Sequence, residues 1–385
     1  MYTSHINAVD IEVTDRCNAE CPVCPRSQAG GEIMPYVKNQ ELDLDYFKLI
    51  GRHFLAHITK WNFCGTKGDP ASAQELFEIL EYILECNSRT EIRVRTNGGA
   101  RNSKFWTRLG NLFKDKDCMV VWSVDGWEDT NHIYRKNVKW EKLYENMRSY
   151  ISTGANSMWE FNRFEHNHKD IPTVQAFCNR HNIFLDIRDP YGFQKIEVDS
   201  LHEKINDSQD RKEIKSTTLI KPIPVYNKTG DGDSSIFAYS IKPYGIPQEK
   251  LLDEHEYSQK VSEYKPGVYD KRHWENIKQD QIKYRVKCKA TDNKQQIYID
   301  SNGMIMPCCY TASKYQMGDE QCIEMFEPIK EKLFVTESNT IYDVLDTVLY
   351  TTTMPAGING TMNDKVGYCI TCVQHCRYGL SIHDD

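Results

Sequence analysis

Three cysteines near the N-terminus are the residues whose type and spacing point most directly to chemistry. Cys17, Cys21 and Cys24 form a C-x3-C-x2-C pattern in the stretch VTDRCNAECPVCPRSQAGG, which follows a short apolar run. Iron–sulfur clusters normally take four cysteine ligands, and catalytic metal sites keep one position open. Because no fourth Cys or His lies in this loop, the pattern predicts a cluster with one free iron. A zinc knuckle and three unrelated core cysteines are the alternatives.

A second group of cysteines lies in the last quarter of the chain. Its members are Cys288, Cys308, Cys369, Cys372 and Cys376. Residues 296–300 and 304–306 are strand-like and flank a Ser-Asn-Gly turn, so they predict a hairpin that brings the first two of these cysteines together. Distant cysteines that converge predict a second metal site. Zinc is the alternative to an iron–sulfur cluster there.

Composition bounds the class of protein. The chain has 385 residues, 27% of them charged and 39% hydrophobic, which predicts a soluble globular protein of two domains. No stretch of eighteen apolar residues and no signal-peptide core is evident, so we expect a cytoplasmic protein without a membrane partner. A net charge of −7 argues against a nucleic-acid partner. In such a chain, 14 cysteines are more typical of metal ligands than of disulfides.

Hydrophobic periodicity predicts alternating strands and helices from residue 9 to about 188. The expected strands are 9–14, 60–64, 91–96, 119–125, 158–164 and 183–188. The expected helices are 43–57, 74–86, 102–114, 140–153 and 171–181. Six such units predict an α/β fold with a parallel sheet. Six is fewer than the eight of a closed barrel, so a partial (β/α)6 TIM-like barrel fits residues 1–190. In barrels, function gathers at the carboxyl ends of the strands, and the cysteine loop follows the first strand.

Small and polar residues gather where the predicted strands end. The second strand leads into CGTKGDP at 64–70, a turn whose backbone groups can approach a ligand closely. Asn97-Gly98 follows the third strand, with a plain turn as the alternative, and 123–126 (SVDG) follows the fourth. Arg135 suits a carboxylate ligand, and a solvated surface arginine is the alternative. We expect 162–168 (NRFEHNH) to line the mouth of the barrel rather than to bind a metal.

The N-terminal loop resembles the cluster motif of the radical S-adenosylmethionine (SAM) superfamily, and NAECPVCPR resembles members that carry a C-terminal SPASM or twitch domain. The resemblance implies a [4Fe–4S] cluster on Cys17, Cys21 and Cys24, whose open iron chelates SAM. Reduction would then cleave SAM to a 5′-deoxyadenosyl radical that abstracts hydrogen from a substrate. Val23 departs from the pattern, because an aromatic residue that packs on the adenine is common at that position.

The same resemblance assigns the strand-end residues to SAM. They are Lys67, Gly68, Asp69, Asn97, Ser123, Asp125 and Arg135. The loop at 67–70 matches the family's GGEP motif, which grips the SAM amino group, although Lys67 replaces a Gly and Asp69 replaces the Glu. Asn97 lies in the matching TNG motif. Ser123 and Arg135 match residues that contact the ribose and carboxylate of SAM.

The C-x14-G-x4-C run that starts at Cys288 resembles the opening of SPASM and twitch domains. It implies a SPASM/twitch-like cysteine-rich domain over 286–385. The polar composition and poor apolar period between this domain and the barrel predict an insertion or linker at 191–285. We expect one auxiliary [4Fe–4S] cluster, held by Cys288, Cys308 and two of the three cysteines at 369–376.

These features together predict a radical SAM enzyme, an oxidoreductase or a peptide-modifying enzyme. The resemblance favours a peptide or protein side chain as the substrate and an electron donor such as flavodoxin or ferredoxin as a partner. The alternatives are radical SAM oxidation of a small molecule such as a carbohydrate, and a non-enzymatic iron–sulfur or zinc-binding module.

Overall fold

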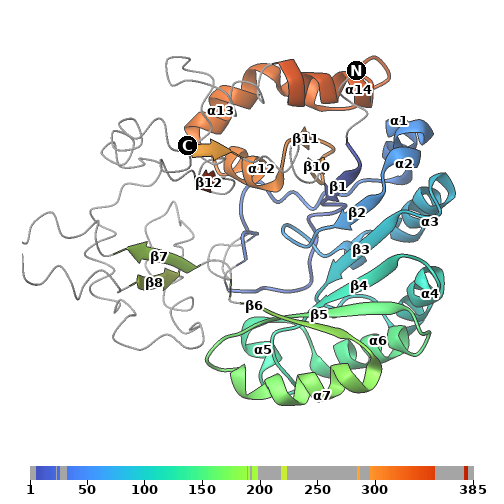
Figure 1. The fold of residues 1–385 in the computed structure, drawn as a ribbon, viewed down its shortest axis with the longest axis vertical. Coiled ribbons are helices and arrows are strands. Elements are labelled where there is room, and N and C mark those ends of the chain that lie inside the picture. The colour runs from blue at the N-terminus through green and yellow to red at the C-terminus, as the bar shows by residue number, and fades with distance from the viewer. Residues whose placement is uncertain are drawn as a thin grey trace, which may run out of the picture.

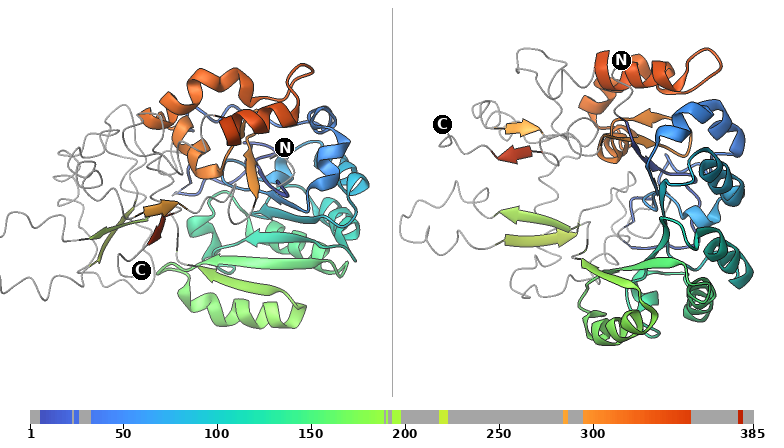
Figure 2. Two further views of the ribbon diagram at one scale, coloured as in Figure 1. Left: turned by 45° about the horizontal axis from the view of Figure 1, so that its top comes forward. Right: turned by 45° about the vertical axis from the view of Figure 1, so that its right-hand side comes forward.

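The protein is built on a curved, mostly parallel sheet that helices cover on its outer face (Figures 1 and 2). A computed structural model describes residues 6–22, 24–26, 33–188, 190, 193–197, 218–222, 284–286, 295–351 and 377–379. The main sheet has eight strands in the order β11-β10-β1-β2-β3-β4-β5-β6. Each neighbouring pair is parallel except β10 and β11.

The first six strands follow one another along the sheet, each separated from the next by helix. They are β1 (Ala8–Ile11), β2 (Lys60–Phe63), β3 (Glu91–Thr96), β4 (Cys118–Ser123), β5 (Asn156–Asn162) and β6 (Phe184–Arg188). This order, with parallel pairing throughout, confirms the predicted partial (β/α)6 barrel. The predicted strands differ from these by at most three residues at either end.

The helices between the strands lie on the convex face of the sheet (Figure 2). They are α1 (Leu44–Ile50), α2 (Arg52–His57), α3 (Leu76–Cys86), α4 (Ser103–Phe113), α6 (Trp140–Ile151) and α7 (Ile171–His181). Three short helices lie in the loops after β2, β4 and β5: η2 (Pro70–Ser72), α5 (Asn131–Tyr134) and η3 (His168–Asp170). The single helix predicted at 43–57 is two helices, because Gly51 adopts φ 96° between them. No helix in the described residues is long and apolar enough to cross a membrane.

Alternation along the strands gives the sheet two different faces. Residues that point outward pack on the helices and are fully buried, among them Trp61 of β2, Trp122 of β4 and Trp159 of β5. Residues that point inward are often charged or polar, and they bond from strand to strand.

A polar row crosses the concave face. Asn62 Nδ2 donates to Asp10 Oδ1 at 2.8 Å, and Arg95 donates to the Asn62 amide oxygen. Glu160 Oε1 lies 3.0 Å from an Arg95 nitrogen and 2.9 Å from one of Arg188. The row therefore joins β1, β2, β3, β5 and β6 through side chains, where closed barrels usually have apolar layers.

The C-terminal part of the chain extends the same sheet. β10 (Gln296–Ile299) pairs in parallel with β1, and β11 (Ile305–Met306) turns back on β10. The predicted hairpin is confirmed, and its position beside the first strand is an addition to the prediction. Asp300 and Met304 close it, with Asp300 N donating to Met304 O at 2.9 Å. Gly303 adopts φ 86° in the turn.

Further helices follow β11, and one of them, α14, lies near the N-terminal helices (Figure 1). They are α12 (Cys309–Gln316), α13 (Glu320–Phe326), η7 (Glu327–Leu333), α14 (Ile341–Leu345) and η8 (Asp346–Thr351). His53 Nδ1 of α2 and the Tyr342 hydroxyl of α14 are 2.6 Å apart. The remaining strands form two antiparallel pairs: β7 (Phe193–Glu197) with β8 (Thr218–Pro222), and β9 (Tyr284–Val286) with β12 (Arg377–Gly379). The domain boundaries predicted at 190/191 and 285/286 stay predictions.

If β10 is an integral strand, removing a buried side chain from it should destabilise the protein strongly. Ile299 is fully buried, so Ile299→Ala should lower the free energy of unfolding by about 2–5 kcal/mol. Ile187 of β6 is 40% exposed, so Ile187→Ala should cost about 1 kcal/mol or less. Thermal unfolding of the two variants compares them directly. Equal, small effects would contradict the integration of β10 into the sheet.

Candidate functional site

The loops that follow the first strands meet at one edge of the sheet. Asp69 N, after β2, donates to Arg16 O in the cysteine loop at 2.7 Å. Asn97 Nδ2, after β3, donates to Asn18 Oδ1 at 3.0 Å. A Cβ added to Gly68 would lie 2.1 Å from the backbone oxygen of Thr14. Gly68 therefore lets the second loop approach the first more closely than any other residue would allow.

The cysteine loop is held from both sides. Thr14 Oγ1 donates to Gln40 O at 2.9 Å, and the Arg26 guanidinium donates twice to Asp15 O, at 3.1 and 3.0 Å. The Cys17 sulfur accepts from Ala19 N at 3.4 Å. Cys24 N donates to Cys21 O at 3.2 Å. The loop thus presents its thiols from a fixed backbone.

Burial makes the three thiols weak acids when no cation is bound to them. It raises the pKa of Cys17 to about 12 and that of Cys24 to about 11, and it raises the pKa of Cys21 as well. A bound metal reverses this effect, because a coordinated thiol loses its proton. The donor set, one buried and two half-buried thiols with N–H groups directed at two of them, fits an iron–sulfur cluster.

No three His, Cys, Asp or Glu side chains in the described part of the chain are grouped to hold one metal ion. A [4Fe–4S] cluster does not require such a group, because each thiolate binds a different iron.

The third and fourth strand ends each place an N–H donor on a cysteine sulfur. Asn97 Nδ2 lies 3.6 Å from Cys17 Sγ, and Arg135 Nη1 lies 3.7 Å from Cys21 Sγ. The Arg135 Nε also donates to the fully buried Asp125 at 2.7 Å. Burial works against the charge of Arg135, but Asp125 and the Cys21 sulfur outweigh it, so the pKa of Arg135 lies above its ordinary value. The Arg135 side chain is only 17% exposed and is paired with Asp125, so it is not a solvated surface arginine, and its contact with SAM stays a prediction.

The carboxylate of Asp125 also fixes the fifth strand. Its Oδ1 accepts from Asn162 N at 2.7 Å and from Asn162 Nδ2 at 3.0 Å. Ser123 is half-buried at the end of β4. Next along the chain, the His166 ring stacks on Phe164 with centroids 5.4 Å apart.

Asp69 and Lys67, on the second loop, are both occupied by protein groups. Asp69 Oδ2 accepts from Thr96 Oγ1 at 3.0 Å and from Asn97 N at 2.8 Å. Its Oδ1 accepts from Ala71 N at 3.0 Å and so caps η2. The Lys67 ammonium lies 2.6 Å from Asp300 Oδ1. Contact of these two residues with SAM stays a prediction, and their side chains hold the loop in place.

Glu12 is a residue of the site that the sequence analysis did not identify. It follows β1, is fully buried, and accepts from Thr66 N at 3.1 Å and from Lys67 N at 3.2 Å. Burial raises its pKa from 4.5 to about 7, against the opposing effect of Lys67. The sequence pattern that could have identified Glu12 is the alternation of Asp10 and Glu12 with apolar residues. This alternation turns both carboxylates away from the core.

Of the five C-terminal cysteines predicted as cluster ligands, Cys308 alone lies in the described residues. It occupies the N-cap position of α12, and its sulfur lies 3.6 Å from Thr311 Oγ1. Cys288, Cys369, Cys372 and Cys376 lie outside the described residues, so the auxiliary cluster stays a prediction.

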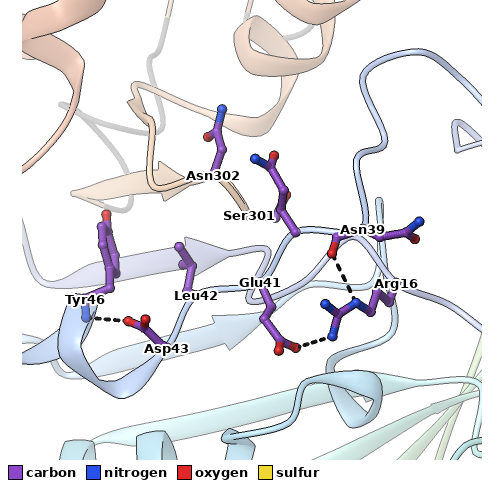
Figure 3. Close-up of a pocket in the computed structure, with 9 residues that line it drawn as sticks. Arg16, Asn39, Glu41, Leu42, Asp43, Tyr46, Ser301 and Asn302 are labelled. Carbon is purple, nitrogen blue, oxygen red and sulfur yellow. Dashed lines mark hydrogen bonds and ion pairs between the residues drawn. The ribbon is translucent and has the colours of Figure 1, made fainter.

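A polar cleft of about 430 Å³ lies beside the cysteine loop (Figure 3). Arg16 crosses it and pairs with Glu41 at 3.0 Å, while its Nε donates to Asn39 O at 3.1 Å. Ser301 and Asn302 of the β10–β11 turn form another wall. The cleft contains none of the residues predicted to contact SAM.

The sequence is similar to GTP 3′,8-cyclases. The relative from Staphylococcus epidermidis (strain RP62A) is 24% identical over 214 residues, which cover 52% of this chain and 61% of the relative. The relative from Staphylococcus carnosus is 23% identical over 220 residues, 55% of this chain and 64% of the relative. The chain thus spans about three fifths of the length of the curated relatives it matches. No protein-family model matches it.

Solved structures with a partial likeness include Streptococcus suis SuiB bound to S-adenosylmethionine. That likeness covers 96% of this chain and 74% of SuiB, with 14% identity and a TM-score of 0.46. The structure of anSMEcpe with AdoMet and the Cp18Cys peptide covers 54% of this chain and 56% of its own, with 16% identity and a TM-score of 0.38.

The cysteine loop at the end of β1, the partial barrel and the similarity to GTP 3′,8-cyclases agree on one class. That class is the radical SAM superfamily, which these three observations support.

The raised pKa of Glu12 gives a test of the site by pH. Between about pH 4.5 and 7 the unfolded chain loses the Glu12 proton and the folded protein keeps it, so this group's contribution to stability falls as pH rises through that window. Glu12→Gln should remove the contribution, which is on the order of 3 kcal/mol across the window. Thermal unfolding of metal-free protein at a series of pH values measures it.

The control for this test is Glu141→Gln, an exposed glutamate of α6. It should keep the pH profile of the wild type. A Glu12→Gln profile parallel to that of the wild type would contradict the burial of a protonated Glu12.

Proposed function

We propose that the protein binds a [4Fe–4S] cluster through Cys17, Cys21 and Cys24 and uses it to cleave SAM reductively. When bound, such a cluster, with one open iron, supplies the electron that converts SAM into methionine and a 5′-deoxyadenosyl radical. The observation that carries this proposal is the convergence of the cysteine loop with Asn97 and Arg135, whose N–H groups lie 3.6 and 3.7 Å from two of the cysteine sulfurs.

The chain's own residues would set the position and electrostatics of this chemistry. Asn97 and Arg135 direct N–H donors at the sulfurs, and such bonds tune the reduction potential of an iron–sulfur site. Asp125 orients Arg135 and keeps a carboxylate beside that cation. The buried strand ends exclude water, which protects a reactive intermediate.

For SAM itself, we propose contacts from the residues that the family motifs mark. They are Lys67, Gly68, Asp69, Asn97, Ser123, Asp125 and Arg135. Because the charged ends of Lys67 and Asp69 bond to Asp300 and to β3, the 67–69 segment would offer SAM its backbone. The half-buried Ser123 and the cationic Arg135 are the groups that suit the ribose and the carboxylate.

We propose that the substrate is a peptide or a protein side chain, attacked at a C–H bond. The support is the C-terminal cysteine spacing, which resembles that of SPASM and twitch enzymes. Cys288, Cys308 and two of the three cysteines at 369–376 would hold an auxiliary cluster that removes an electron from the substrate radical or anchors the substrate. Flavodoxin or ferredoxin would supply the first electron in the cytoplasm.

A small-molecule substrate is the second candidate. It is favoured by the similarity to proteins named for a reaction of GTP. The two candidates differ in what accelerates SAM cleavage: a peptide in one case, and a compact metabolite in the other.

Replacing Cys17, Cys21 and Cys24 together with Ala should reduce 5′-deoxyadenosine formation to background. The assay uses anaerobically reconstituted, dithionite-reduced protein and SAM. The variant should keep about four irons from the auxiliary cluster. Cys86→Ala, on the outer helix α3, is the matched control and should behave as the wild type. Wild-type cleavage by the triple variant would end the proposal, and zinc in place of the remaining irons would end the auxiliary-cluster claim.

Asn97→Ala tests the strand-end contacts. Loss of a hydrogen bond to a charged group costs about 1.5–3 kcal/mol, so SAM affinity should fall roughly ten- to hundred-fold. Asn179→Ala, on the exposed face of α7, should leave the affinity unchanged. Equilibrium dialysis with labelled SAM measures both. Unchanged affinity in Asn97→Ala, with normal iron content, would make Asn97 a structural turn residue only.

A further inference from the structure

A buried ion pair joins the candidate site to the C-terminal part of the chain. Lys67 Nζ lies 2.6 Å from Asp300 Oδ1, and the two side chains are only 5% and 3% exposed. Lys67 belongs to the loop after β2, and Asp300 follows β10, 233 residues further along the chain.

Two tyrosine rings lie near the Lys67 ammonium, and Glu12 binds the Lys67 backbone. Its nitrogen lies 6.0 Å from the centre of the Tyr36 ring and 5.7 Å from that of Tyr298. Glu12 accepts the backbone N–H of Lys67 and of its neighbour Thr66. The backbone of the loop is thus tied to β1 while its side chain is tied to β10.

Asp300 is likewise held by hydrogen bonds from its own part of the chain. Its Oδ1 accepts from Ser301 N at 2.8 Å in the hairpin turn. Its Oδ2 accepts from Gln316 Nε2, at the end of α12. One carboxylate therefore holds the loop after β2, the β10–β11 turn and the helix whose N-cap position Cys308 occupies.

Directly beyond Lys67, the loop makes the contacts that order the site. Gly68 packs against Thr14 O in the cysteine loop, and Asp69 binds the end of β3 through Thr96 and Asn97. A shift of Lys67 would be passed to both.

We propose that Asp300 is a positioning residue, through which the docked C-terminal hairpin holds the Lys67–Asp69 loop in the conformation that binds SAM. This inference rests on the proposed function. It adds that the C-terminal segment controls SAM binding at the barrel as well as any task of its own cysteines. Because linkage is reciprocal, SAM should in turn stabilise the docked hairpin.

The first test is Asp300→Asn in reconstituted holoenzyme. It leaves the Lys67 ammonium buried without its charged partner, so the KM for SAM in 5′-deoxyadenosine formation should rise at least about ten-fold. At saturating SAM, kcat should stay within about three-fold, because the cysteine loop is intact. Asp300→Glu keeps the charge and should recover part of the affinity.

Asp319→Ala is the matched control for loosening the C-terminal segment. Asp319 caps α13 and accepts from Cys322 N at 3.1 Å, so its loss destabilises the same segment without touching the loop. Its KM for SAM should equal that of the wild type. An equal rise of KM in both variants would show a general structural effect and would overturn the inference.

Hydrogen exchange on wild-type holoenzyme tests the coupling without a mutation. SAM should slow exchange of the amides at 297–304 more than those of α7, which lies at the other edge of the sheet (Figure 1). Equal effects on the two segments, or a wild-type KM in Asp300→Asn, would overturn the inference while leaving SAM cleavage established. A wild-type protein that binds no SAM would overturn the proposed function, and this inference with it.

Discussion

Burying charged side chains at the strand ends is costly unless each one is paired, and this requirement organises the whole site. Asp125 pairs with Arg135, Lys67 with Asp300, and Glu160 with Arg95 and Arg188. The pairs of Lys67 and of Glu160 join different strands or loops, and the Asp125–Arg135 pair closes the loop after β4, so satisfying the charges also fixes the backbone. The strand-end loops are therefore ordered by the protein itself, and a ligand that binds there meets a preorganised surface.

The same pairs connect the cysteine sulfurs to charges further away. Cys21 accepts from Arg135, which holds the buried Asp125. Asp125 is hydrogen-bonded in turn to Asn162 of β5. A metal centre on this loop would thus be influenced by groups on the fourth and fifth strands, because hydrogen bonds and burial around a cluster set its potential.

The barrel was predictable because its signals are local. Trp61 and Phe63 alternate with Lys60 and Asn62, which is the period of a strand with one core face. The break at Gly51 was missed, since a single glycine does not interrupt the apolar pattern on either side.

Pairings between distant segments produce no local sequence pattern, so they could not be predicted from the sequence. Nothing in the Tyr298 segment shows that it lies beside Asp10. The partnership of Lys67 with Asp300, and the burial of Glu12, follow from that placement and were missed with it. The family motifs marked Lys67 and Asp69 correctly as strand-end residues, but they did not reveal that protein groups already occupy both side chains.

The position of β10 also bears on how the chain folds as it is synthesised. β1 is an interior strand in the finished sheet, yet its partner on one side is made 288 residues after it, as the bond between Asn7 and Gln295 illustrates. Until then the barrel has a free edge of unpaired backbone groups, which other chains can join. The first barrel strand is therefore exposed to aggregation for most of translation, and pairing with β10 covers that edge.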